Sequence, residues 1–155
     1  MTPALKDELK QNKPFASLHQ EAMLNIMRTN NLLNDSLELT LKPYKITGTQ
    51  YNVLRILRGA EPNGLCRNEV RGRLLNRMPD ATRLLDRMEE AGLVTRSRES
   101  DDRRMVRTHI TRQGRKLVDS LDEPMTTEHR KQLGRLTSEQ LKTLISLLTQ
   151  VRNPD

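Results

Sequence analysis

Aromatic residues, cysteine and long apolar runs are all scarce in this chain of 155 residues. Tryptophan is absent, and one phenylalanine and two tyrosines make up 2% of the sequence, so the core has to be built from Leu, Ile, Val and Met. Cys66 is the single cysteine, which excludes an intramolecular disulfide. No apolar run approaches the ~18 residues that span a membrane, and the opening MTPALKDELKQNK is too polar for a signal peptide. We therefore expect a cytoplasmic protein with no membrane contact.

Apolar residues in general are few. They make up 34% of the sequence, whereas charged residues make up 30%. A chain of this size with so little apolar material builds only a small core. These proportions indicate a small, mainly α-helical protein that completes its core by pairing with a second copy of itself.

Positive charge is abundant and unevenly distributed. The net charge is +7, and residues 65–115 hold 13 arginines, no lysine and eight acids, whereas the other 104 residues carry 14 basic and 12 acidic side chains. The planar guanidinium binds phosphates and guanine edges through two parallel hydrogen bonds, which a lysine ammonium does not do. The central segment therefore indicates binding to a nucleic acid, although arginine-rich helices also occur on ordinary solvated surfaces.

The spacing of apolar residues predicts one long helix and several shorter ones. Residues 1–13 are polar, and we expect them to form a flexible N-terminus. Thr47 with Gln50, and Thr137 with Gln140, have the spacing of a capping box, which places the starts of two helices. The predicted helices cover residues 14–41, 48–57, 68–75, 79–91, 112–134 with a bend at Pro124, and 138–151.

Two segments of alternating pattern follow the predicted helix over 79–91, which ends at the C-cap glycine Gly92. Residues 93–98 and 105–110 flank a charged loop, which is typical of a β-hairpin. Two short helices joined by a turn and followed by such a hairpin form a winged helix-turn-helix. In this fold the second helix enters the major groove of DNA, and the hairpin contacts neighbouring phosphates or the minor groove.

Arginines are the main candidates for DNA contacts. The predicted helix over 79–91 presents Thr82, Arg83 and Arg87 outward, and these residue types bond base edges and phosphates. In the alternative interpretation the two arginines only pair with acids of the same helix, but each such pair contributes ~0.2–0.5 kcal/mol and does not explain the clustering of arginine. The candidate DNA-binding residues are Arg67, Asn68, Arg77, Asp80, Thr82, Arg83, Arg87, Arg96, Arg98, Asp102, Arg103 and Arg104.

The stretches ITGTQYNVLRIL and RMPDATRLLDRMEEAGLVTRSRESDDRRMVRTHITRQGRKL resemble the MarR family of bacterial transcription regulators. The resemblance covers residues 46–117, and its most specific part is the D-x-R-R-x-V-x-x-x-(I/L)-T-x-x-G string over 101–114. It implies that Asp102 forms an ion pair with Arg104 and fixes the approach of the wing to the minor groove, with Arg103 as a phosphate contact. A carboxylate beside an exposed arginine orders it before binding, which lowers the entropic cost of the contact.

The resemblance also implies a ligand-responsive repressor that binds a pseudo-palindromic operator as a homodimer. Residues 14–42 and 112–152 would then form a helical dimerisation region, and residues 46–111 the DNA-binding domain. In the alternative interpretation the terminal helices pack only within one subunit. Activation in place of repression stays open, because its sign depends on where the operator lies.

Members of this family commonly respond to small aromatic acids, lipophilic toxins, thiol oxidation or metals. An aromatic or lipophilic effector needs a pocket between the dimerisation helices and the DNA-binding lobe, with a cation or hydroxyl for a carboxylate. Methionines spaced along a helix also serve simply as core filler. The candidate pocket residues are His19, Met23, Met27, Tyr44, Tyr51 and Arg55.

Other kinds of site have less support in the sequence. Cys66 lies near arginines, which leaves a thiol-redox-responsive regulator as an alternative, although peroxide sensors of this family carry their cysteine in the first helix, where this chain has none. The three histidines are scattered without metal-ligand spacing, and no catalytic motif is present, so we expect no metal, no cofactor and no enzyme. The remaining alternative is a small-molecule or protein-binding module with weak, non-specific DNA binding.

Overall fold

The computed structural model describes residues 4–78, 80–98 and 105–153, which fold mainly into helices. A small antiparallel sheet joins them, with the strand order β1-β3-β2. The helices are α1 (Leu5–Glu8), α2 (Leu18–Leu41), the 3-10 helix η1 (Lys42–Tyr44), α3 (Gly48–Arg58), α4 (Arg67–Arg73), α5 (Ala81–Glu90), α6 (Arg112–Ser120), α7 (Asp122–Leu133) and α8 (Ser138–Arg152). The strands are β1 (Leu65–Cys66), β2 (Val94–Arg98) and β3 (Val106–Ile110).

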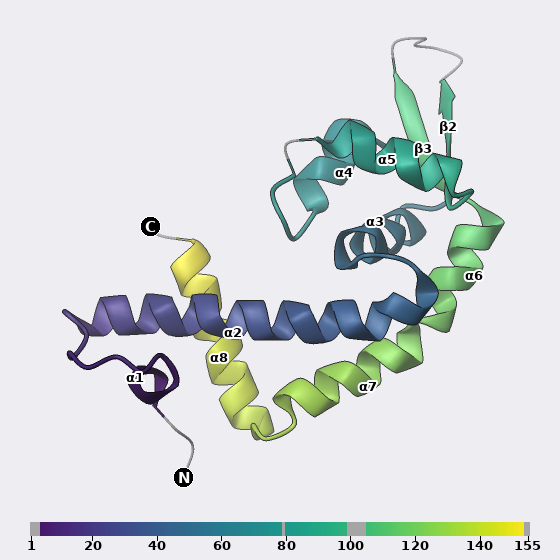
Figure 1. The fold of residues 1–155 in the computed structure, drawn as a ribbon. Helices are drawn as coiled ribbons and strands as arrows, with labels where there is room; N and C mark the ends of the chain where they lie inside the picture. Colours follow the sequence, from purple (N-terminus) through teal and green to yellow (C-terminus); the bar gives the residue numbers. More distant parts are fainter. Residues whose placement is uncertain (1–3, 79, 99–104, 154–155) are drawn as a thin grey trace.

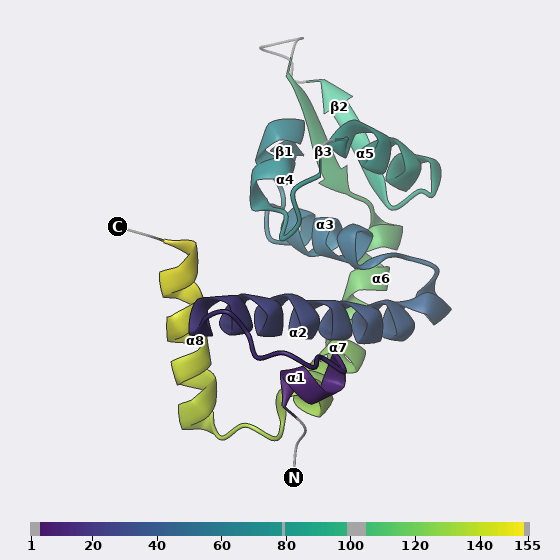
Figure 2. The same ribbon diagram turned by 60° about the vertical axis from the view of Figure 1, so that its left-hand side comes forward.

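Helices α3, α4, α5 and α6 and the three strands form a lobe on one side of the long helix α2, and helix α7 packs on the other side of α2. Figure 1 shows α3 packed above α2 and α7 below it, with α4, α5 and the β2–β3 hairpin stacked above α3. Figure 2 shows the same order from the side, with α8 at the N-terminal end of α2. The predicted fold class, a winged helix-turn-helix with a small hairpin wing and flanking N- and C-terminal helices, is confirmed.

Local capping decides where the helices begin. Both predicted capping boxes are present, since Gln50 N donates to Thr47 Oγ1 and Thr47 N donates to Gln50 Oε1, and Thr137 and Gln140 repeat the pattern. Ser17 caps α2, whose regular turns therefore begin at Leu18, four residues later than predicted. The N-terminal stretch expected to be flexible contains α1, in which one apolar side chain is buried.

One strand and one helix break differ from the sequence predictions. The two-residue strand β1, which pairs with β3, was not predicted, because two residues are too few to show an alternating pattern. The predicted bend at Pro124 falls at Leu121, which ends α6 and begins α7. Pro124 lies in the first turn of α7, where its missing N–H leaves no helical hydrogen bond unmade.

The core is aliphatic apart from Tyr51 and lies within the lobe. It joins residues of the C-terminal end of α2, of α3, α4, α5, the sheet and α6, and of the start of α7. Helix α8 has no buried residue, and many apolar side chains of α2 and α8 are exposed, which the lobe's core leaves uncovered. These exposed side chains are Leu18, Met23, Ile26, Met27, Leu32, Leu39, Ile145, Leu147 and Val151. None of the helices in the described part of the chain combines the length and hydropathy that crossing a bilayer requires.

The turn after α5 is joined to the start of α6. Gly92 has φ +73°, and its N–H donates to the carbonyl of Glu89, which ends α5 in a left-handed cap. Thr111 Oγ1 donates to the Gly92 carbonyl over 2.7 Å and accepts from Gly114 N over 3.0 Å. A Cβ on Gly114 would lie 2.2 Å from the Leu93 carbonyl oxygen, so only glycine permits this approach.

We predict that Gly114→Ala lowers the free energy of unfolding by about 1–3 kcal/mol, because the added methyl group has to push the α6 backbone away from Leu93. Urea denaturation measures the effect. Gly72→Ala is the matched control, since a Cβ at this exposed position of α4 meets nothing within 4 Å and removes a flexible residue from a helix. Equal unfolding midpoints for Gly114→Ala and the wild-type protein would contradict the prediction.

Candidate nucleic-acid interface

Helix α5 is amphipathic, and its two faces have separate tasks. Ala81, Leu84, Leu85 and Met88 are buried against the lobe. Asp80, one of the candidate DNA-binding residues, is exposed and is the N-cap of this helix, because its side chain accepts from Arg83 N over 3.0 Å. The buried face fixes the helix in the lobe and leaves its opposite face open to a partner.

Two arginines on the outward face are available to a partner. The side chain of Arg83 is 80% exposed, and its Nε lies 3.4 Å from Asp80 Oδ2, an exposed pair that contributes little energy. Arg87 is exposed, and no ion pair joins it to another residue of the described ranges. The acids of α5 therefore do not neutralise these guanidinium groups, and the face stays cationic.

Arg96 occupies a different position from these two. It lies on β2 with its side chain 28% exposed, and its Nη2 lies 2.6 Å from Glu89 Oε2 and 2.7 Å from Asp86 Oδ1. The backbone N–H of Arg96 also donates to Glu89, and these bonds hold the pKa of the Glu89 carboxyl below its usual value. Arg96, a predicted DNA contact, thus joins the wing strand to α5 through its Nε and Nη2 atoms.

A hydrogen bond between α4 and α5 orients the two helices of the helix-turn-helix. Arg67 Nη1, at the start of α4, donates to Thr82 Oγ1 in the first turn of α5 over 3.1 Å. This bond uses Thr82, another predicted DNA contact, within the protein. Asn68 on α4 and Arg77 in the turn before α5 are both exposed beside it.

The wing reaches beyond the described residues. Strands β2 and β3 pair in register from Val94 with Ile110 to Arg98 with Val106, and Arg98 is exposed at the end of β2. The hairpin projects past α5 in both views (Figures 1 and 2). Asp102, Arg103 and Arg104, which the sequence predicts to form the wing tip, lie outside the described residues.

The thiol lies between the wing and the helices. Cys66 is half-buried and lines a hollow of about 410 Å³ bounded by α4, α5 and β3. It caps α4 through its backbone, whose N–H donates to Glu69 Oε2 over 2.8 Å and thereby lowers the pKa of that carboxyl. In the described parts of the chain, no group of three metal-ligating side chains gathers around it or elsewhere.

The six predicted pocket residues do not share one cavity of the protomer. His19, Met23 and Met27 are exposed on the N-terminal half of α2, whereas Tyr44 follows the C-terminal end of this helix. Because a helix rises about 1.5 Å per residue, the length of α2 separates Tyr44 from these three residues. Tyr51 is buried in the core, which raises the pKa of its hydroxyl. Arg55 is exposed, with its guanidinium carbon 6.0 Å from the centre of the Tyr51 ring.

A hollow that the sequence did not predict does contain Tyr44. Its volume is about 550 Å³, and it lies between η1, the turn after α5 and helix α6. Ile46, Leu93 and Leu117 supply apolar walls, and Lys45 and Lys116 lie at its edge. These two lysines are 71 positions apart in the sequence, so no local pattern could have shown that they meet.

Comparisons with known proteins agree with this arrangement. The MarR family profile matches residues 46–106, which hold α3, the helix-turn-helix and most of the wing. A MarR transcription factor from Planctomyces limnophilus, of known crystal structure, is 38% identical, with 88% of this chain and 98% of that chain covered and a TM-score of 0.67. The chain belongs to the MarR family. It is therefore a DNA-binding transcription regulator.

Two further MarR-type proteins are similar over nearly their whole length. A mutant MarR from E. coli, crystallised with operator DNA, is 26% identical, covers 88% of this chain and 99% of that chain, and gives a TM-score of 0.78. The HTH-type transcriptional regulator FarR from Neisseria gonorrhoeae is 27% identical over 90% of this chain and 97% of its own length. The long helix and C-terminal helices of this chain therefore belong to the shared architecture.

We predict that Arg96→Ala lowers the melting temperature at neutral pH by a few degrees, because α5 and β2 lose their joint. The lowered pKa of Glu89 means that the ion pair stabilises the fold above the usual carboxyl pKa of 4.5 and stops doing so as the pH falls through the lower folded value. The difference from wild type should therefore shrink in acid. Arg98→Ala, on the same strand but exposed, is the control. Equal decreases in melting temperature for both variants at pH 7 would show that the ion pairs of Arg96 do not hold β2 on α5.

Proposed function

We propose that the protein is a cytoplasmic, ligand-responsive repressor that binds a pseudo-palindromic operator as a homodimer. The observation that carries this proposal is the cationic outward face of α5, whose Arg83 and Arg87 stay exposed while Arg67 and Arg96 are used to hold the helix in place. A rigidly mounted helix with exposed arginines is what reading a major groove requires. Repression then follows from occupancy, because a dimer on a promoter excludes polymerase from the same DNA.

In this proposal the candidate residues divide into three groups. Arg83 and Arg87 contact bases or phosphates in the major groove. Exposed Asn68, Arg77 and Arg98 contact the backbone around it, where phosphate bonds fix the register of the protein on the duplex. The wing tip contributes the remaining contacts, with Asp102 orienting Arg104 toward the minor groove and Arg103 meeting a phosphate.

The homodimer is supported by the exposed apolar faces of α2 and α8. Leu18 is 82% exposed, Leu39 is 70% exposed and Val151 is 67% exposed, in helices that flank the lobe. The stability of an isolated 15-residue helix such as α8 is marginal in water. Because α8 buries no residue within the protomer, it needs another surface to pack on. A second copy of the chain supplies that surface, and its two-fold symmetry matches a palindromic site.

The hollow that contains Tyr44 is the proposed site for an effector. Its apolar walls and the ammonium groups of Lys45 and Lys116 suit a small aromatic or lipophilic anion. It adjoins the turn at Gly92 that ends α5, so an occupant that favours another position of this turn would also shift the recognition helix. The binding-module alternative would keep this site but lose sequence-specific DNA binding.

We predict that Arg83→Ala and Arg104→Ala each weaken binding to the DNA upstream of the protein's own gene by about 1–3 kcal/mol, roughly tenfold or more, with little change in melting temperature. Fluorescence anisotropy at two salt concentrations measures this, with a scrambled duplex as reference and sedimentation giving the stoichiometry. Arg130→Ala, an exposed arginine of α7, is the charge-matched control. Equal, weak binding of the wild-type protein to both duplexes would reject operator binding and favour the binding module.

We also predict that benzoate binds in the Tyr44 hollow and that Lys116→Gln weakens it roughly tenfold, because one charge-assisted hydrogen bond to the carboxylate is lost. Amide chemical shifts of residues 44–46 and 113–120 report the binding. Lys13→Gln is the control for overall charge. Equal affinity for the neutral analogue benzamide would show that the lysines do not select an anion.

A further inference from the structure

The corner between α6 and α7 is where the lobe meets the dimerisation helices. Helix α6 packs on α3 within the lobe, whereas α7 packs along α2 on the other side (Figure 1). The two helices are separated by Leu121 alone, which is fully buried. A rotation of the lobe relative to α2 and α7 therefore changes the geometry at Leu121 and at the side chains that bridge the corner, as well as at the η1 connection between α2 and α3.

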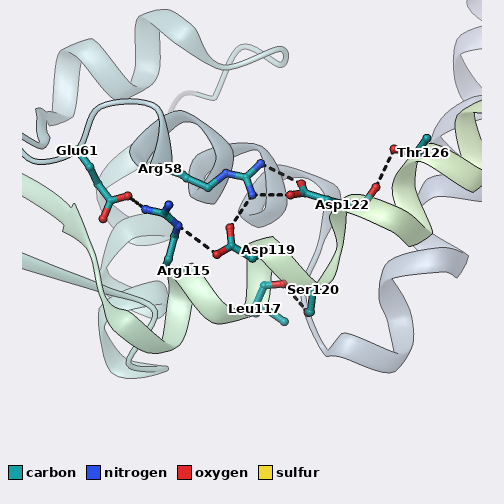
Figure 3. Close-up of polar contacts among 8 residues, drawn as sticks. All are labelled: Arg58, Glu61, Arg115, Leu117, Asp119, Ser120, Asp122 and Thr126. Carbon is teal, nitrogen blue, oxygen red and sulfur yellow. Dashed lines mark hydrogen bonds and ion pairs between the residues drawn. The ribbon is translucent and has the colours of Figure 1, made fainter.

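One arginine bridges the corner from both sides (Figure 3). Arg58, the last residue of α3, donates from Nη1 to Asp119 Oδ1 over 2.7 Å and to Asp122 Oδ2 over 2.9 Å. Its Nη2 donates to the second oxygen of Asp122 over 2.9 Å. Asp119 lies in the last turn of α6 and Asp122 is the first residue of α7. The planar fork of Arg58 thus holds the end of one helix and the start of the next in one fixed geometry.

A second arginine extends this cluster to the turn after α3. Arg115 Nε lies 3.2 Å from Asp119 Oδ2, so the two oxygens of this carboxylate serve different arginines, and Arg115 also pairs with Glu61. Hydrogen bonds from Arg58 lower the pKa of the Asp122 carboxyl below its usual value. The cluster is therefore a network of two arginines and three carboxylates, which is harder to rearrange than an isolated pair.

The cluster controls orientation more than it controls stability. Buried Leu57, Val118 and Leu121 already hold α6 on α3, but apolar packing is non-directional. The carboxylates of the cluster are about half exposed, so their pairs add little to the free energy of unfolding. Their bidentate geometry instead restricts the angle at Leu121. The corner between α6 and α7 lies below α3 in Figure 1, whereas α5 and the wing lie above α3. The carboxylates that Arg58 binds therefore belong to a corner on the opposite side of α3 from the proposed DNA contacts.

We propose that Arg58 is a positioning residue for operator binding, which holds Asp119 and Asp122 together across the α6–α7 corner and so fixes the separation of the two recognition helices in the dimer. This inference rests on the proposed homodimer. Two recognition helices have to meet major grooves about one helical turn, 34–36 Å, apart. A rotation at each corner acts on both lobes, so a loose corner lets the dimer accept half-sites at more than one spacing.

The test measures how strictly the protein demands one spacing between half-sites. Operator duplexes with the spacer changed by one or two base pairs are titrated with wild-type protein, Arg58→Gln and Arg58→Lys. Wild type should prefer its own spacing over the two-base-pair changes roughly tenfold or more, and Arg58→Gln should reduce this preference to about threefold or less. Binding to a random duplex should stay within about twofold. Arg58→Lys should resemble Arg58→Gln, because an ammonium keeps the charge but not the fork.

Two further variants separate orientation from folding. Asp122→Asn weakens only the α7 side of the bridge and leaves the pair between Arg58 and Asp119 in the lobe. Asp122→Asn should lose the spacing preference while its melting temperature stays nearly unchanged. If Arg58→Gln does not fold, Asp122→Asn still tests the proposal. Arg130→Gln controls for loss of charge. An unchanged spacing preference in Asp122→Asn, or an equal loss of affinity on all duplexes with a lower salt slope, would overturn the proposal.

A readout without DNA distinguishes this inference from the proposed function. Spin labels on Thr95→Cys, an exposed position of β2, in a Cys66→Ser background report the distance between the two lobes of the free dimer. Arg58→Gln should broaden this distribution, and Arg130→Gln should not. A wild-type monomer, or wild-type protein that ignores the operator, would reject the proposed function. A dimer that binds the operator, with an unchanged distance distribution and spacing preference in Arg58→Gln, would reject this inference alone.

Discussion

The contact between the start of α6 and the turn after α5 is the constraint on which the lobe depends. Three elements meet there: the recognition helix ends at Gly92, the wing begins at Leu93, and α6 begins after Thr111. The Thr111 hydroxyl satisfies the Gly92 carbonyl and the Gly114 N–H together, and the missing side chain of Gly114 lets the backbones approach. Because one small contact places α5, the wing and the start of α6, which leads to α7, their relative positions are set together.

Arginine has two tasks in this protein, and only the structure separates them. Arg58, Arg67 and Arg96 are fixed by partners within the fold, whereas Arg83 and Arg87 on α5 remain exposed. A guanidinium that bridges two carboxylates orients the elements that carry them, which suits joints between helices and strands. The arginine-rich composition therefore reflects an internal scaffold as well as a cationic surface. Net charge alone overstates the number of side chains free to meet a phosphate.

Sequence reasoning succeeded for several local signals. The capping boxes, the glycine at the end of α5, the hairpin and the outward position of Arg83 all follow from patterns within a few residues. It was less successful where a partner lies far away in the chain. Arg58 meets its carboxylates 61 and 64 positions later, and nothing near Arg58 in the sequence distinguishes it from a surface arginine. The two-residue strand β1 exists only because β3 lies beside it.

The same dependence on partners in another element applies to Arg96, whose ion pairs with Asp86 and Glu89 the sequence did not predict. Its alternation with Ser97 and Thr95 indicates a strand, but a strand pattern does not say what its side chain meets across the lobe. The acids that hold it, Asp86 and Glu89, are one turn apart on α5, and the sequence analysis considered pairing of such acids only with arginines of their own helix. The attraction between Arg96 and Glu89 is stronger than that of a fully exposed pair within one helix, because Arg96 is partly desolvated between the helix and the sheet.

Stability and recognition are coupled in the proposed dimer. The apolar faces of α2 and α8 that the protomer leaves exposed are the surfaces that a partner subunit would bury, so folding of these helices and assembly occur together. The spacing of the two lobes then depends on how rigidly each lobe is joined to α7. The apolar core of the lobe reaches Leu41 at the end of α2 and Met125 near the start of α7, but apolar packing is non-directional and leaves this angle less defined. Directional ion pairs at the α6–α7 corner supply the orientation that non-directional packing leaves open.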